Sequence, residues 1–161
     1  MGSLLFIVVL ALVFVNINIR NDSKTLSDEA TRIDKSVLDS LDGSRQLRTD
    51  NMTVKGLWDK IVRCTTGSLC DSYDDNYVAV PVEAGKESEL ILNVAQAAGY
   101  SRMALKNTQD CHFVQSTDIC SDTLFRGKFR LNIYITSQPD LSTKDIAPRV
   151  WRNVHLNLIF N

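Results

Sequence analysis

An unbroken run of twelve apolar residues, Leu4 to Val15, limits most strongly what this chain can form. Residues 3–19 carry no charged side chain. A helix of that length rises about 25 Å, whereas the hydrocarbon core of a bilayer is about 30 Å thick. The run is therefore a marginal membrane span. A helix that is apolar on every side must be buried in lipid or against other helices.

Three interpretations of the run are open. A secretory signal peptide has an apolar core of similar length, but no Lys or Arg precedes this one, and residues 13–16 lack the small side chains that a signal peptidase requires. An uncleaved anchor that holds an ectodomain is the second interpretation, although Arg20 and Lys24 weakly favour a cytoplasmic C-terminal part. The third interpretation joins the run to the residues that follow it.

Those following residues predict an amphipathic helix. Its apolar stripe has spacings of 4, 3, 4 and 4 and consists of Leu26, Ala30, Ile33, Val37 and Leu41. Gly43-Ser44 is the predicted stop. The two halves give a rod of roughly 65 Å if the helix is continuous. The polar residues between Asn16 and Ser23 have poor helix propensity, so we expect a kink or an unwound turn there.

The arrangement resembles the N-terminal half of a mature type IV pilin. Residues 1–5 also resemble the archaeal class III signal-peptide motif, which has glutamine, any residue, serine, any residue and glutamate. Ser3 matches that motif. Leu5 stands where the family carries a glutamate that meets the terminal amine of a neighbouring subunit.

The resemblance implies a cell-surface filament built from copies of this chain or other pilin-like subunits, with the chain held in a membrane before assembly. It implies that the apolar half packs in the filament core. The assembly residues would be Leu4, Leu5, Phe6, Ile7, Val8, Val9, Leu10, Leu12, Val13, Phe14 and Val15. The alternative from a different class is a single-pass anchored ectodomain that binds another protein in an envelope or secretion complex.

We expect an α+β fold in which the long helix packs on a small antiparallel sheet. The apolar helix would cover residues 1–20, an amphipathic stalk residues 21–47, and a β-rich head with disulfides residues 48–161. Apolar spacing predicts a short helix over residues 53–63, with Trp58 as a core anchor. A polar turn over residues 71–76 should precede a strand at 77–82, and Pro81 favours an edge position for that strand.

The clearest strand signals lie near the end of the chain. Residues 129–136 alternate between apolar and polar side chains, and residues 150–160 do so apart from Arg152, so the two segments should pair. Their connection, residues 137–149, should lie on the surface. Alternation at residues 90–94 favours another strand over a helix that runs on to Ala98, and residues 101–108 are expected to form a helical turn.

Four cysteines form two local pairs along the chain, Cys64 with Cys70 and Cys111 with Cys120. Three pairings are possible, and two short disulfide loops in an oxidising compartment are the simplest. Four reduced thiols in a cytosolic protein are the alternative. The spacings differ from those of zinc knuckles, so no zinc site is expected. Asn21 and Asn51 begin N-glycosylation sequons, which suits an extracellular chain.

No catalytic constellation emerges, and we expect neither an enzyme nor a cofactor. His112 and His155 are the two histidines, and neither has a Ser or Cys nucleophile in a recognised setting. The oxygen ligands of residues 71–76 lack the spacing of an EF-hand, so a solvated turn is the simpler interpretation. The four tyrosines are scattered along the sequence and predict no aromatic platform. The net charge of −1 argues against nucleic-acid binding.

Overall fold

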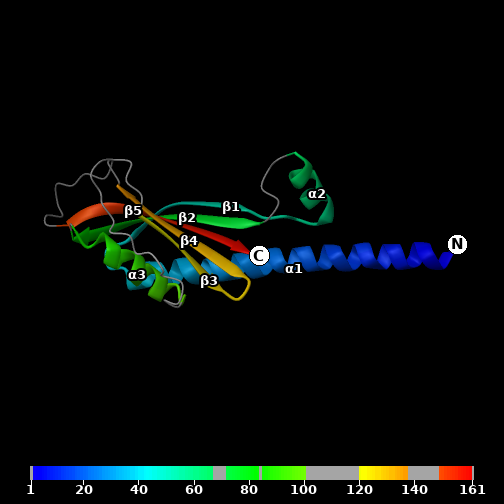
Figure 1. Ribbon diagram of the computed structural model, residues 1–161, viewed down its shortest axis with the longest axis horizontal. Coiled ribbons are helices and arrows are strands. Elements are labelled where there is room, and N and C mark those ends of the chain that lie inside the picture. Colours follow the sequence, from blue (N-terminus) through cyan, green and yellow to red (C-terminus); the bar gives the residue numbers. More distant parts are fainter. Residues whose placement is uncertain (1, 67–71, 84, 101–119, 138–148, 161) are drawn as a thin grey trace.

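A computed structural model describes residues 2–66, 72–83, 85–100, 120–137 and 149–160. The fold is α+β, as expected: a long N-terminal helix packs on a five-stranded antiparallel sheet (Figure 1). Helix α1, Gly2–Ser40, has 39 residues. Its second half lies along the sheet, whereas its first half projects away from the head (Figure 1).

Helix α1 is continuous, so the expected break between Asn16 and Ser23 does not occur. Tertiary hydrogen bonds explain why polar residues are tolerated there. The side-chain oxygen of Asn16 accepts the N–H of Leu57 at 3.1 Å, and the Ser23 hydroxyl donates to the carbonyl of Val54 at 2.8 Å. The predicted apolar stripe from residue 26 to residue 41 is buried throughout.

The helix ends close to the predicted stop. Ser40 is its last residue, and Gly43 has a φ of 74°, in the left-handed region that glycine adopts without strain. A side chain at position 43 would also meet Pro81, whose Cγ lies 3.1 Å from the position of a Cβ. The chain then enters the sheet at Arg45, before residue 47, where the stalk was expected to end.

The sheet has the order β1-β2-β5-β4-β3, and each neighbouring pair is antiparallel. The strands are β1 Arg45–Met52, β2 Tyr73–Glu83, β3 Cys120–Arg126, β4 Phe129–Ser137 and β5 Arg149–Phe160. The predicted pairing of β4 with β5 is confirmed, with Ile133 opposite Leu156. Strands β1 and β3 form the edges.

The core lies between the sheet and the two helices α1 and α3, the latter spanning Glu87–Ala97. Ile33 and Val37 of α1 contribute from the helix side, and Leu131, Ile133 and Ile135 of β4 from the sheet, all with less than 3% exposure. Every other residue of β4 therefore faces the helices, which is the pattern that the sequence alternation predicts.

The strand expected at residues 90–94 is wrong, because this segment belongs to α3. Leu90, Ile91, Val94, Ala95 and Ala98 are all buried, and their spacing is that of one helix face. The alternation of Leu90, Leu92 and Val94 overlaps with that helical pattern over a few residues. Only the longer alternative, which runs on to Ala98, describes the whole buried face.

Strand β2 starts at Tyr73, so the polar turn expected over residues 71–76 is wrong for residues 73–76, and residue 71 lies outside the described part. The strand is also internal, not an edge. Pro81 nevertheless lies beyond Ala79, the last residue of β2 that pairs with β1. At Pro81 the strand therefore has no β1 neighbour on that side, which explains why a residue without an N–H is tolerated. Strand β1, Arg45–Met52, was not expected at all, because its sequence is mostly polar and shows no apolar alternation. Most of its residues are exposed in the structure.

Helix α2 spans Leu57–Thr65, a shift from the predicted 53–63, and none of its residues is buried. The expectation that Trp58 anchors the core is wrong, since 78% of its surface is exposed. Val54 is buried but precedes the helix. The expected helical turn at 101–108 lies outside the described residues, as does most of the connection at 137–149.

Candidate functional site

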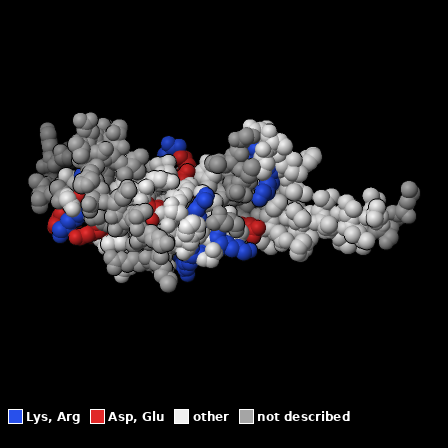
Figure 2. Space-filling view, in the orientation of Figure 1, with Lys and Arg blue, Asp and Glu red and all other residues white. Residues whose placement is uncertain are grey.

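The projecting half of α1 exposes an extended apolar surface. Twelve large apolar side chains there are 40–74% exposed: Leu4, Leu5, Phe6, Ile7, Val8, Val9, Leu10, Leu12, Val13, Phe14, Val15 and Ile17. The set includes every predicted assembly residue. The helix is long and apolar enough to cross a membrane, and none of its most apolar window is buried within the chain. Charged residues lie over the head and near its junction with the projecting helix (Figure 2).

This exposure is costly in water. Covering one fully exposed large apolar side chain contributes about 1.5–3 kcal/mol. Because the twelve side chains are roughly half exposed, covering all of them would contribute on the order of 10–20 kcal/mol. A typical domain is stable by only about 5–15 kcal/mol. The projecting half therefore requires an apolar environment outside its own chain.

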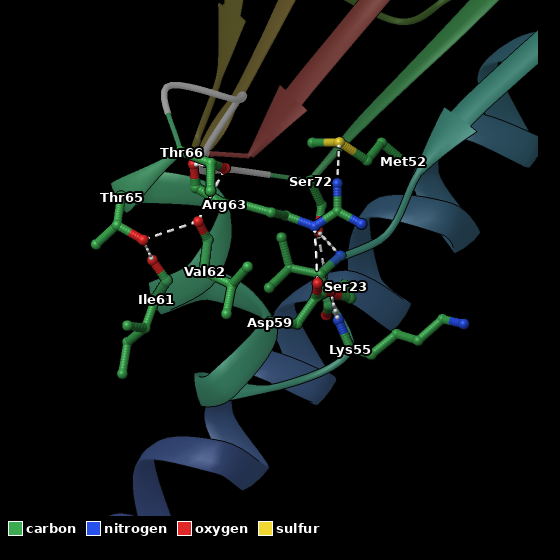
Figure 3. Close-up of polar contacts among 11 residues, drawn as sticks. Ser23, Met52, Lys55, Asp59, Ile61, Val62, Arg63, Thr65, Thr66 and Ser72 are labelled. Carbon is green, nitrogen blue, oxygen red and sulfur yellow. Dashed lines mark hydrogen bonds and ion pairs between the residues drawn. The ribbon is translucent and has the colours of Figure 1, made fainter.

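Helix α2 is fastened beside α1 at the point where α1 leaves the head. The Ser23 hydroxyl bonds to Val54, as described above, and lies 3.1 Å from the hydroxyl oxygen of Ser72, which in turn accepts the Val54 N–H at 2.8 Å (Figure 3). Ser23 and Ser72 are both buried. The segment that leads into α2 is thus tied to both α1 and the start of β2.

Two further bonds hold the first turn of α2. Arg20 Nε donates to the carbonyl of Lys55 at 3.3 Å, and Asn16 accepts the Leu57 N–H. Gly56, between them, approaches Asn16 so closely that a Cβ would lie 2.3 Å from its side-chain oxygen. An alanine here would have to displace the end of the Asn16 side chain, so glycine suits this contact because of the close approach and not because of its backbone angles.

A polar chain also braces α2 internally. Asp59 accepts the Lys55 N–H at 3.0 Å and the Arg63 Nε at 2.9 Å, and Arg63 contacts the Met52 sulfur at 2.8 Å (Figure 3). Met52 ends β1, so the brace joins α2 to the sheet. These contacts hold α2, and with it the exposed apolar side chains of α2, in a fixed position.

A groove of about 650 Å³ lies between α1 and α2. Its lining is mainly apolar and comprises Val9, Leu12, Val13, Asn16, Arg20, Lys55, Gly56, Leu57, Trp58, Asp59 and Ile61. The polar residues Asn16, Arg20 and Lys55 stand where α1 approaches the head, whereas Val9 lies toward the N-terminus. Sequence reasoning missed this groove because it treated the apolar side of α2 as core. The position of Trp58 between two basic residues, Lys55 and Lys60, was the available signal.

The sheet face opposite the helices carries an aromatic row that the scattered tyrosines did not predict. His155 stacks between Tyr77, with ring centroids 4.3 Å apart, and Tyr134, at 5.3 Å. Its Nε2 lies 2.9 Å from Asp75 Oδ1. Spacing along the sequence did not reveal that these rings come together. The rings stack on one another, which is an arrangement that stabilises neighbouring strands.

Amides extend this row along the same face. Asp75 also accepts the Asn157 amide at 2.7 Å, Asn157 accepts from Asn132 at 2.7 Å, and Asn132 accepts from the Thr123 hydroxyl at 2.9 Å. The row therefore joins β2, β5, β4 and β3 through satisfied hydrogen bonds. His155 contacts Asp75 and two aromatic rings, so its role in this row is structural. His112, the other candidate base, lies outside the described residues.

The oxygen ligands considered for calcium are separated by strand geometry. Asp74 and Asn76 are buried on the helix side, whereas Asp75 faces His155 on the other side. Among the residues that the structure describes, no group of three or more His, Cys, Asp or Glu side chains is placed to hold a metal ion. Burial, with the nearby negative charges of Asp34 and Asp75, raises the pKa of Asp74 to about 6.

Cys64 and Cys120 are each disulfide-bonded. Cys70 and Cys111 lie outside the described residues, so the two local pairings remain predictions. Both sequon asparagines, Asn21 and Asn51, are exposed. Their surroundings differ, because Asn21 lies in the middle of α1, two residues before the buried Ser23.

No family model, no curated protein and no solved structure matches the chain.

Proposed function

We propose that this chain is a structural, non-enzymatic subunit of an extracellular filament resembling type IV pili, which polymerises through the first half of α1. The observation that carries the proposal is the projecting helix, apolar on every side and uncovered from Leu4 to Val15. Burial against the same helix of other copies would remove this surface from water. The chain would be held in a membrane before assembly and would reach the cell surface afterwards.

The division of α1 supports this role. The apolar stripe of its second half is buried against the head through Leu26, Ile33 and Val37, so the apolar surface left to contact other subunits is that of the first half. A head packed on one end of an apolar rod suits stacking of the rods with the heads outside. Disulfides at Cys64 and Cys120 suit an oxidising exterior.

Surface filaments should be purified and tested for this chain, with residues 1–20 protected from protease. Leu10→Glu should abolish filaments, because a carboxylate in the apolar bundle costs several kcal/mol. Lys35→Glu, an exposed change on the stalk half of α1, is the matched control and should assemble normally. Recovery of the chain only as detergent-solubilised monomers would overturn the proposal.

The alternative is a single-pass anchored ectodomain that binds a partner in an envelope or secretion complex. The one observation that favours it is that α1 is long and apolar enough to cross a membrane. Replacing residues 1–15 by an unrelated apolar span distinguishes the two roles while keeping Asn16 and Arg20, which hold α2. A filament subunit should then insert but fail to polymerise, whereas an anchored ectodomain should keep its partner.

A further inference from the structure

Helix α2 presents apolar and basic side chains in an order that matches one leaflet of a bilayer. Trp58, Ile61 and Val62 are 41–78% exposed, and Trp58 and Ile61 line the groove beside Val9 and Val13. The surface of α2 is thus continuous with the apolar surface of α1. An amphipathic helix with tryptophan and basic residues is typical of a membrane interface.

The length of the groove agrees with this setting. Arg20 and Val9 mark its two ends along α1, and eleven residues of helix rise about 16 Å. Half of a bilayer's hydrocarbon core is about 15 Å thick. A phospholipid with its phosphate beside Arg20 would therefore extend its acyl chains to about the level of Val9.

The charges at the head end suit an anionic lipid. Arg20, Lys24 and Lys55 are exposed there, against one exposed carboxylate in the same stretch, that of Asp22. The carboxylate of Asp59, which also lines the groove, is already engaged by Arg63 and the Lys55 N–H. Cations at this level attract lipid phosphates, and each contributes about 1 kcal/mol near an anionic surface.

We propose that the groove between α1 and α2 seats phospholipid of the leaflet next to the head, so that α2 lies in the bilayer interface before assembly. Trp58 and Ile61 contact acyl chains, and Arg20 and Lys55 bind the phosphate. The inference rests on the membrane-held state in the proposed function. It adds a second membrane contact that fixes the depth and orientation of the head.

The two tryptophans provide the test, because Trp58 is exposed and Trp151 is 6% exposed within the head. The full chain is reconstituted in phosphatidylcholine and phosphatidylglycerol vesicles whose acyl chains carry bromine near the headgroup. We expect strong quenching of the Trp58 emission, obtained as the difference between the wild-type chain and Trp58→Phe. Brominated phosphatidylglycerol should quench more than brominated phosphatidylcholine, and Lys55→Gln should reduce this preference up to about fivefold. Lys35→Gln should leave the preference unchanged.

Insertion of α1 is checked separately by vesicle flotation and protease protection of residues 1–20. Unquenched Trp58 in vesicles where α1 is inserted would overturn the lipid seat while leaving the filament proposal intact. Shielding of Trp58 that rises with protein-to-lipid ratio, without bromine quenching, would also overturn it and would assign the groove to a second copy. Failure of α1 to insert would contradict both proposals.

Discussion

Arg152 on β5 donates from Nη2 to Oε1 of Glu87 in the first turn of α3, at 2.6 Å. The two side chains are only 14% and 6% exposed. The pair explains why Arg152 interrupts the apolar alternation of β5: it lies on the helix side of the sheet, where its charge is compensated by a carboxylate from the helix. The Glu87 carboxylate offsets much of the cost of removing this cation from water.

Glu87→Ala should therefore lower the free energy of unfolding by about 3 kcal/mol, since it removes the carboxylate that the largely buried Arg152 guanidinium contacts. Urea denaturation of the detergent-solubilised chain measures this loss. Glu89→Ala, an exposed carboxylate in the same helical turn, is the matched control and should change stability by less than about 0.5 kcal/mol. Equal losses in the two variants would show that the helix dipole, and not the ion pair, accounts for the effect.

Asp74 makes stability depend on pH in a defined direction. Because burial raises its pKa to about 6, the folded chain holds this proton more tightly than the unfolded chain, and stability falls as pH rises from about 4 to about 6. Asp74→Asn should remove this loss and raise the stability at pH 7.5 by on the order of 2 kcal/mol. Thermal melts between pH 4 and pH 7.5 check it. The exposed Asp39→Asn serves as control, and an unchanged pH slope in Asp74→Asn would contradict the assignment.

Ile33 joins α1 to the sheet and is 2% exposed. Ile33→Ala should cost about 2–5 kcal/mol, through lost burial and the cavity that remains. Lys35→Ala, two residues along and exposed, should be near neutral. Chemical denaturation of both variants gives the comparison. A small effect at Ile33 would mean that the stalk half of α1 is not part of the cooperative fold.

Gly56→Ala should loosen α2 from α1, because the new Cβ displaces the Asn16 oxygen that accepts the Leu57 N–H. We expect a loss of about 1 kcal/mol and faster hydrogen exchange at the Leu57 amide. Asn16→Ala removes the same bond without the clash. The double variant should then lose less than the sum of the two single changes, since both act on one contact. Additive losses would indicate that the two residues act separately.

Glycosylation, if the chain passes through a compartment that attaches N-glycans, should favour Asn51 over Asn21. The sequon hydroxyl of Ser23 is buried against Val54, whereas Thr53 in the other sequon is exposed. Intact-mass and peptide mapping of the secreted or surface-held chain should place the glycan on Asn51. Asn51→Gln should remove it, with Asn21→Gln as the paired control. A glycan mainly on Asn21 would show that modification precedes folding of α1.

The sequence by itself determined the elements whose signals are local. The stripe of Leu26, Ile33 and Val37 has the helical period, and β4 and β5 alternate over many residues, so burial of one face follows directly from each pattern. The all-apolar character of the first half of α1 likewise needs no tertiary information. These signals are strong because each one extends over several turns or strand repeats.

Tertiary structure alone decided the rest. The spacing of Trp58 predicts a core residue, yet its side chain is exposed. The core is already filled by α1, α3 and the sheet. Hydrogen bonds of Asn16, Ser23 and Ser72 hold the segment that leads into α2 beside the projecting helix. The row from Asp75 through His155 forms only when strands distant in sequence come into register. An amphipathic pattern specifies that one face avoids water, and the partner that covers it is set by which surfaces the fold leaves open.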